Sequence, residues 1–255
     1  MSAFVLKLIA IVSMLIDHTA HIFQTEITAV SPWLYIALRA VGRLAFPLFA
    51  FGVAEGASKT HSGKKYLIRM LVFAMISQIP FSLMLGVRVP DLSFKLFGRA
   101  IGFSTEMSVM VTLFLGLALC LSLKENRPLA AAAVLAFAYL ADITVGMDYG
   151  FLGVLFVLAL YYAKRSKPGL IAVILIFSAA VHSGTLISAA KLILGRGGIK
   201  PSSIVMGLVY IAATALAAIP VMLYNGKRGP KTGIWAYLVY PVHMAALCVT
   251  YYLIH

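Results

Sequence analysis

Long hydrophobic runs separated by short polar connections dominate the pattern of residues along the chain. A helix of about 20 apolar residues crosses the hydrocarbon core of a bilayer. The runs predict membrane-spanning helices at about 4–23, 33–56, 66–86, 107–123, 129–146, 149–163, 170–190, 202–223 and 234–254. Because the connections leave no room for a soluble domain, we expect an all-α polytopic bundle of about nine spans that forms one integral membrane domain over residues 1–255.

Basic residues are unevenly distributed among the connections between these spans. The loops at 59–65, 124–127, 164–167 and 227–231 carry more Lys and Arg than those on the opposite side. The positive-inside rule then places the N-terminus in the cytoplasm. The connection at 87–105 is long for a bundle and mixes apolar with charged residues, so we expect it to lie along the membrane surface or to re-enter the membrane.

The composition is that of a membrane protein and argues against a soluble domain and against a nucleic-acid-binding protein. Of the 255 residues, 62% are hydrophobic and 11% are charged, whereas a soluble domain has about 25% charged residues. The net charge of +13 would suggest nucleic acid in a soluble protein, but here the basic residues orient the helices, so we expect no nucleic-acid partner. Cys120 and Cys248 lie near the ends of different spans and have no metal-ligand spacing, which predicts neither a disulfide nor a metal site.

The first span contains a polar cluster of Asp17, His18 and His21. A charged side chain at mid-membrane costs about 2.5–3.5 kcal/mol, so this face should look into the protein or an aqueous cavity. Arg39 and Arg43, one turn apart in the second span, lie at a depth where they could pair with Asp17. Such a pair could simply hold two helices together. The adjacent histidine favours a functional site, because imidazole titrates near neutral pH.

Two further features are candidates for chemistry. His243 follows Pro241 in the last span and is a second intramembrane histidine, although it could equally be a hydrogen-bonded core residue. The glycine-rich basic turn at 225–230 could hold phosphate groups, or it could be an ordinary positive-inside loop.

Taken together, these motifs resemble the TraX family, named after a conjugation protein associated with N-acetylation of pilin. The resemblance covers nearly the whole chain. It rests on the ordered motifs Leu8–His18, Leu38–Phe51, Glu55–Gly56, Tyr66–Arg69, Ile76–Phe81, Asp148–Gly150, Tyr224–Gly229 and Tyr240–His243. The chain departs from the family pattern at 92–106, where Thr105-Glu106 stands in a region that is richer in Asn and Thr in the family.

The resemblance implies a bacterial inner-membrane acetyltransferase that moves an acetyl group from cytoplasmic acetyl-coenzyme A to an acceptor on the outer side. The acceptor would be a protein N-terminus, a glycan or a lipid headgroup, and the enzyme could be a homo-oligomer in contact with membrane lipid. The expected phosphate-binding residues are Lys64, Lys65, Arg69, Asn225, Lys227 and Arg228.

In that reaction His18 would be the general base or would carry the acetyl group itself. Asp17 and His21 would tune the proton transfer, Arg39 or Arg43 would stabilise the oxyanion, and His243 would complete the site. Two other functions are compatible with the same residues. A proton-coupled transporter or flippase also uses intramembrane Asp, His and Arg, and in a non-catalytic assembly factor the charges would only hold helices together.

Overall fold

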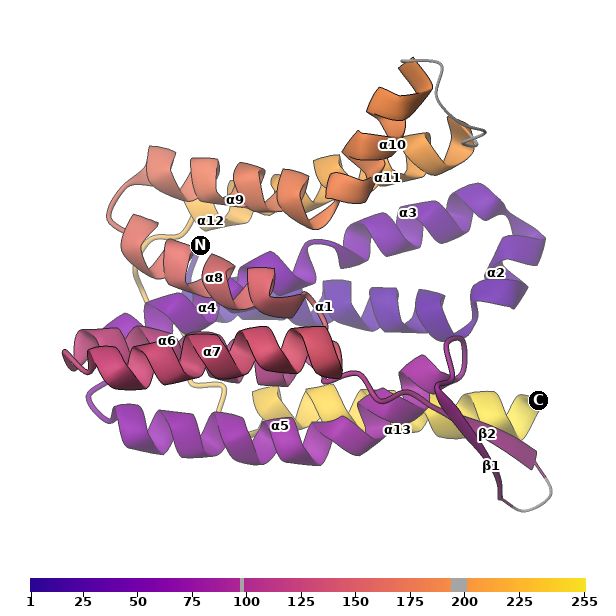
Figure 1. Cartoon of the computed structure of the whole chain (residues 1–255), viewed down its shortest axis with the longest axis horizontal. Helices are drawn as coiled ribbons and strands as arrows, with labels where there is room; N and C mark the ends of the chain where they lie inside the picture. The colour runs from indigo at the N-terminus through magenta and orange to yellow at the C-terminus, as the bar shows by residue number, and fades with distance from the viewer. Residues whose placement is uncertain (97–98, 194–200) are drawn as a thin grey trace. The chain divides into compact units, whose positions relative to one another are not determined.

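The chain is almost entirely helical and divides into two compact units (Figure 1). The computed structural model describes residues 1–96, 99–193 and 201–255. The first unit comprises residues 1–49 and 163–229, and the second comprises residues 50–162 and 230–255. Both units therefore join segments from the two halves of the chain, and the expectation of one integral membrane domain stays a prediction.

The first unit joins helices from the start of the chain to helices from residues 163–229. Ser2 caps the first of them by accepting a hydrogen bond from the Val5 amide, and Ser31 caps α3 just before Pro32. Helix α1 packs along α3, and α11 packs against α9, α10 and α3. The helices of this unit are α1 (Ala3–Ile22), α2 (Gln24–Val30), α3 (Pro32–Gly42), the start of α4 (Ala45–Lys59), α9 (Lys167–Val181), α10 (Ser183–Ile193), α11 (Pro201–Leu216) and α12 (Ala218–Met222).

The second unit packs its helices around small residues. A Cβ added at Gly116 would lie 2.7 Å from the Cβ of Val157, so α6 and α8 approach closely only because glycine is there. Helix α5 packs against α13 and α6. The elements of this unit are the rest of α4, α5 (Gly63–Gly86), β1 (Leu92–Leu96), β2 (Arg99–Phe103), α6 (Val109–Lys124), α7 (Pro128–Thr144), α8 (Gly150–Ala163) and α13 (Trp235–Ile254).

The predicted second span is broken at Arg43 and Leu44, between α3 and α4. Proline has no amide hydrogen and its ring clashes with the carbonyl four residues earlier, which for Pro47 is the carbonyl of Arg43. The helix break therefore lies where the proline prevents continuation of the hydrogen-bond ladder. The side chain of Arg43 leaves the backbone at this break.

Among the described residues, five helices are long and apolar enough to cross a membrane, and the number rises to six if the bent pair α9–α10 counts as one span. The five are 3–22, 32–59, 63–86, 202–222 and 235–254. The prediction of nine spans is thus confirmed only in its coarser form, an all-α membrane protein. The predicted spans 107–123, 129–146 and 149–163 do form helices, but these have 16, 17 and 14 residues, short of the roughly 20 that a span needs.

The connection at 87–105 contains a β-hairpin, and its position relative to the membrane surface stays a prediction. Strands β1 and β2 pair antiparallel, with Ser93 opposite Gly102. Gly102 lies against Gly86 at the end of α5, and a Cβ at either glycine would collide with the backbone of the other. The Ser104 amide donates to the Ser82 carbonyl at 2.9 Å. Close backbone contact therefore fixes the hairpin to the end of α5.

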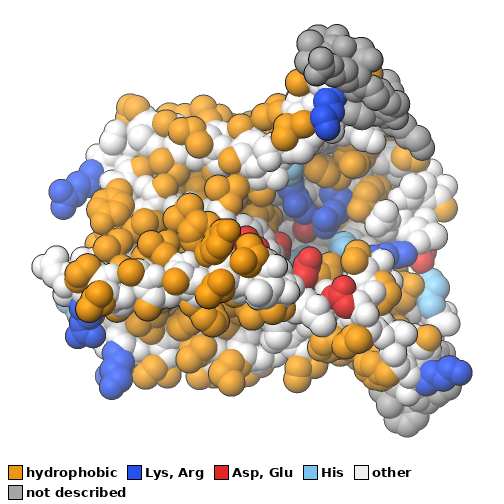
Figure 2. Space-filling view, viewed as in Figure 1, with side chains coloured by type: hydrophobic (Ala, Val, Ile, Leu, Met, Phe, Trp, Pro, Cys, Tyr) orange, Lys and Arg blue, Asp and Glu red, His pale blue; other side chains and the backbone are white. Residues whose placement is uncertain are grey.

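Hydrophobic side chains cover much of the surface, as expected of helices that face lipid. Figure 2 shows them over the visible side of α7 and α8. On α7, Leu129 and Phe137 are exposed by 86% and 54%. This distribution is that of a membrane protein. The side of the membrane on which the N-terminus lies stays a prediction.

Candidate functional site

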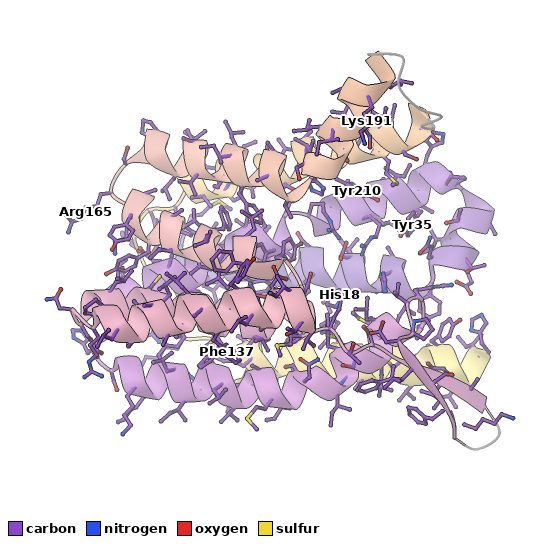
Figure 3. The ribbon with its side chains drawn as sticks, viewed as in Figure 1. His18, Tyr35, Phe137, Arg165, Lys191 and Tyr210 are labelled. Atoms are coloured by element: carbon purple, nitrogen blue, oxygen red, sulfur yellow. The ribbon has the colours of Figure 1, made fainter. Side chains whose placement is uncertain are left out.

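The last two turns of α1 carry the predicted polar face. Asp17, His18 and His21 all lie within this helix, and their side chains are partly buried. Figure 3 labels His18 on α1. One turn closer to the N-terminus of α1, on the same face, Ser13 is 3% exposed. The spacing of three and four residues thus produces the single polar stripe that helical geometry predicts.

Asp17 forms an ion pair with both arginines of α3. Its Oδ2 is 2.8 Å from Arg39 Nη1, and its Oδ1 is 3.0 Å from Arg43 Nη2. Arg39 Nη1 also donates to the Asp17 carbonyl at 3.3 Å. The three side chains are only 14–18% exposed. The predicted pairing between the first two spans is therefore present, and both carboxylate oxygens accept from guanidinium groups.

Gly42 allows α3 to come this close to α1. A Cβ built on Gly42 would collide with the side chain of Asp17. Arg43 then reaches the carboxylate from the helix break, and its Nε donates to the Arg39 carbonyl at 3.4 Å. Gly42 and the helix break that precedes Pro47 thus position Arg43.

The charged cluster continues to helices that the sequence did not connect with it. The Arg43 guanidinium carbon is 5.7 Å from the centroid of the Tyr210 ring on α11, a cation–π contact. The Tyr210 ring is in turn 6.2 Å from the ring of His182. His182 lies where α9 and α10 meet at a 63° bend, and its Nε2 is 3.4 Å from the Thr214 hydroxyl. A polar network therefore joins α1, α3, α11 and the bend.

Sequence reasoning missed Tyr210 and Thr214. They are four residues apart on an otherwise apolar helix, which places them on one face toward the unit's interior. That spacing was the signal available. His182, which falls in the predicted span 170–190, was likewise not connected to the cluster of α1 and α3.

His243 belongs to the second unit and has a local partner. Its Nδ1 is 2.6 Å from the Val239 carbonyl. A carbonyl can only accept, so Nδ1 carries the proton. The ring also lies 5.9 Å from the ring of Tyr240. Both contacts lie within α13, and the role predicted for His243 stays a prediction.

The predicted phosphate-binding residues are divided between the units. Lys64, Lys65 and Arg69 begin α5 in the second unit, where Arg69 lies over the rings of Tyr66 and Tyr237 at 5.7 and 5.5 Å. The turn at 225–228 belongs to the first unit. Neither unit by itself therefore collects the whole set.

The turn with Asn225, Lys227 and Arg228 is fixed to the N-terminus. The Asn225 amide donates to the Met1 carbonyl at 2.9 Å, and the carbonyls of Lys227 and Arg228 accept from the amides that begin α1, at 2.9 and 3.1 Å. The Asn225 side chain accepts from the Lys227 amide at 3.1 Å. These backbone groups stabilise the turn itself. Phosphate binding by the three side chains stays a prediction.

The fold and this buried ion-pair network define a helical membrane protein whose polar residues join helices inside the apolar region. The TraX protein family model matches residues 2–251, so the chain belongs to the TraX family. The chain is also similar to a protein of Dichelobacter nodosus named as the probable fimbrial assembly protein FimC of serogroup H1. The two are 35% identical over 97% of this chain and 94% of that protein. No solved structure matches the chain significantly.

These comparisons confirm the family resemblance and correct the function that was drawn from it. The relative is named for fimbrial assembly, and neither match is named for acyl transfer. The prediction of an acetyl-coenzyme A-dependent acetyltransferase is therefore wrong. The individual roles predicted for His18, Asp17, His21, Arg39, Arg43 and His243, and the binding of acetyl-coenzyme A, are not tested by the comparisons.

Proposed function

We propose that this protein is a non-catalytic assembly factor for a fimbrial or pilus-like surface structure. The observation that carries the proposal is the relative named for fimbrial assembly, with which the chain shares 35% identity over nearly its whole length. The partners would be membrane lipid and a fimbrial subunit.

The geometry of the charged cluster supports a structural role. The Asp17 carboxylate forms one ion pair through each oxygen, Oδ2 with Arg39 and Oδ1 with Arg43. An ionised carboxylate held by two guanidiniums is stabilised in its charged form, which suits a connection between helices better than the exchange of a proton. In the proposed function, the cluster therefore holds α1 and α3 in the arrangement that the fimbrial subunit contacts.

The proposal places the chain in the bacterial inner membrane as a multi-pass protein with a cytoplasmic N-terminus. The five long spans, the bent pair and the three shorter helices together make nine crossings. Helices of 14–17 residues cross when the bilayer thins locally or flanking residues reach toward the interface, at a modest cost. The orientation is supported by the basic loops at 59–65, 124–127, 164–167 and 227–231.

Deletion of the gene in its host bacterium tests the proposal. We expect surface fimbriae, counted by electron microscopy, to be lost and to return with the wild-type gene. A His18→Ala gene should restore them fully, because no base catalysis is needed. Full fimbriation in the deletion strain would contradict the proposal. So would failure of His18→Ala when immunoblots show that the variant is inserted at the wild-type level.

A further inference from the structure

The hairpin of β1 and β2 has an outer edge, that of β1, against which no other described element packs extensively. Strand β2 packs against α5, whereas among the described residues the principal contacts of β1 are with β2 alone. A two-stranded hairpin is marginal by itself, and an uncovered edge is a template for a further strand. The outer edge of β1 is thus open to another extended segment.

The hydrogen-bond pattern identifies the groups on that edge. The Gly102 amide donates to the Tyr252 hydroxyl of α13 at 3.3 Å, so it points away from Ser93, its partner on β1. Ser93 and Gly102 are therefore a non-hydrogen-bonded pair, and the N–H and C=O of Ser93 point outward. Because the pattern repeats every two residues, the N–H and C=O of Lys95 also point outward.

The side chains of β1 indicate what kind of segment would fit. Leu92 and Phe94 lie two residues apart on one face and are exposed by 59% and 46%. Lys95 is exposed next to them. A matching strand would set apolar residues opposite Leu92 and Phe94 and an acidic residue near Lys95, since cross-strand pairs of these kinds are stabilising.

The hairpin is also held rigidly enough to act as a template. Contact between Gly86 and Gly102, the bond from Ser104 to Ser82 and the bond from Gly102 to Tyr252 fix it to α5 and α13. With a cytoplasmic N-terminus, α5 is the third span and its end lies on the outer side. An exported subunit would be present on that side.

We propose that the outer edge of β1 docks an extended, apolar and acidic segment of the fimbrial subunit, which adds to the hairpin as a third strand. The inference rests on the proposed function, because it takes the subunit as the partner. Main-chain hydrogen bonds from Ser93 and Lys95 provide affinity, and the alternating side chains provide specificity.

Photo-cross-linking in cells that express an affinity-tagged fimbrial subunit tests this docking. Benzoylphenylalanine replaces Phe94 at the edge strand, and the same residue replaces Phe137 on α7 as a control on an exposed apolar surface. We expect an adduct with the tagged subunit from position 94 and none from position 137. An adduct of position 94 with a second copy of this chain, and none with the subunit, would overturn the proposal.

Proline at the edge separates docking from the hairpin's own stability. Ser93→Pro removes an outward N–H, which an edge strand tolerates, whereas Ser93→Thr keeps it. We expect Ser93→Pro to lower the adduct at position 94 by about tenfold, and Ser93→Thr to leave it unchanged. If deletion of the gene abolishes fimbriae but Ser93→Pro leaves both the adduct and the fimbriae at wild-type levels, the docking inference fails while the proposed function stands.

Discussion

The two units join their helices with different polar chemistry. The first unit uses charge, with Asp17 between Arg39 and Arg43. The second unit has one connection through a neutral amide, at Gln78, and another through the Lys124 ammonium of α6, which donates to the Ala57, Ser58 and Thr60 carbonyls. Gln78 on α5 donates to the Glu106 carbonyl at 2.7 Å and to the Ser82 hydroxyl at 3.1 Å, and accepts from the Ser108 amide at 3.0 Å.

This difference determines how much stability each unit loses when one partner of its connection is removed. Removing one member of a buried ion pair leaves an uncompensated charge, which costs about 3–5 kcal/mol. Removing a neutral partner leaves unsatisfied polar groups, which cost about 1–3 kcal/mol. The first unit should therefore be the more sensitive to single substitutions, and the following variants are chosen to test that ranking.

Asp17→Ala should have the largest effect. It leaves two guanidiniums without their carboxylate and should lower the free energy of unfolding by about 3–5 kcal/mol. Unfolding in mixed micelles, followed by circular dichroism, measures the loss. The triple replacement of Asp17, Arg39 and Arg43 by Met should cost far less, because no charge is left unpaired. A loss below about 1 kcal/mol for Asp17→Ala would show that the pair is effectively solvated.

Gly42→Ala tests the same cluster without altering a charge. The added Cβ would collide with the Asp17 side chain, so α1 and α3 must separate, at a cost of about 1–3 kcal/mol. Gly52→Ala is the matched control, because its Cβ would have no neighbour within 4 Å. In a helix this control should be neutral or stabilising by up to about 1 kcal/mol. Equal losses in the two variants would argue against the close approach of α1 and α3.

Gln78→Met tests the neutral connection of the second unit. The side chain keeps its approximate size but loses its hydrogen bonds with the Glu106 carbonyl and the Ser108 amide, so we expect a loss of about 1–3 kcal/mol. Gln24→Met on α2, where the side chain is exposed, should change stability by less than about 0.5 kcal/mol. A loss at position 78 larger than that of Asp17→Ala would reverse the ranking of the two units.

The sequence predicted the charged cluster but not its surroundings. Asp17, Arg39 and Arg43 could be paired because their spacing and depth follow from helix geometry alone. Tyr210 and His182 could not be added, because periodicity shows which face of a helix is polar but not which distant helix that face meets. The same limit applies to Gln78, whose partners follow a β-hairpin.

The hairpin had a signal that was passed over. Residues 92–96 read Leu-Ser-Phe-Lys-Leu, which alternates apolar and polar residues with the period of a strand. The segment was interpreted as a surface or re-entrant connection because it mixes apolar residues with charges. The three helices at 109–163 show the opposite limit, because apolar runs predict helices reliably but do not by themselves establish that each helix crosses the membrane.

Of these predictions, protonation of the exposed Asp91 carboxylate should have the smallest effect on stability. It gives a carboxylate of the second unit to compare with Asp17 of the first. It is held at the base of the hairpin by the Thr105 amide at 2.7 Å, the Thr105 hydroxyl at 2.9 Å and the Ser104 hydroxyl at 3.1 Å. These donors, the Thr105 amide first, hold the pKa of Asp91 below its usual value. Unlike the pair at Asp17, this carboxylate has neutral partners and lies in water.

A depressed pKa fixes the sign of the pH dependence. The bonds to Asp91 stabilise the hairpin above the unfolded pKa of about 3.9 and are lost as pH falls through the lower folded value. Titration of the Asp91 carboxyl carbon by nuclear magnetic resonance should therefore give a midpoint below about 3.9. Acid should release the hairpin in wild type, whereas Asp91→Asn, which keeps one acceptor oxygen and has no charge, should show no such step. A midpoint at or above the unfolded value would mean that the donors do not hold the carboxylate in solution.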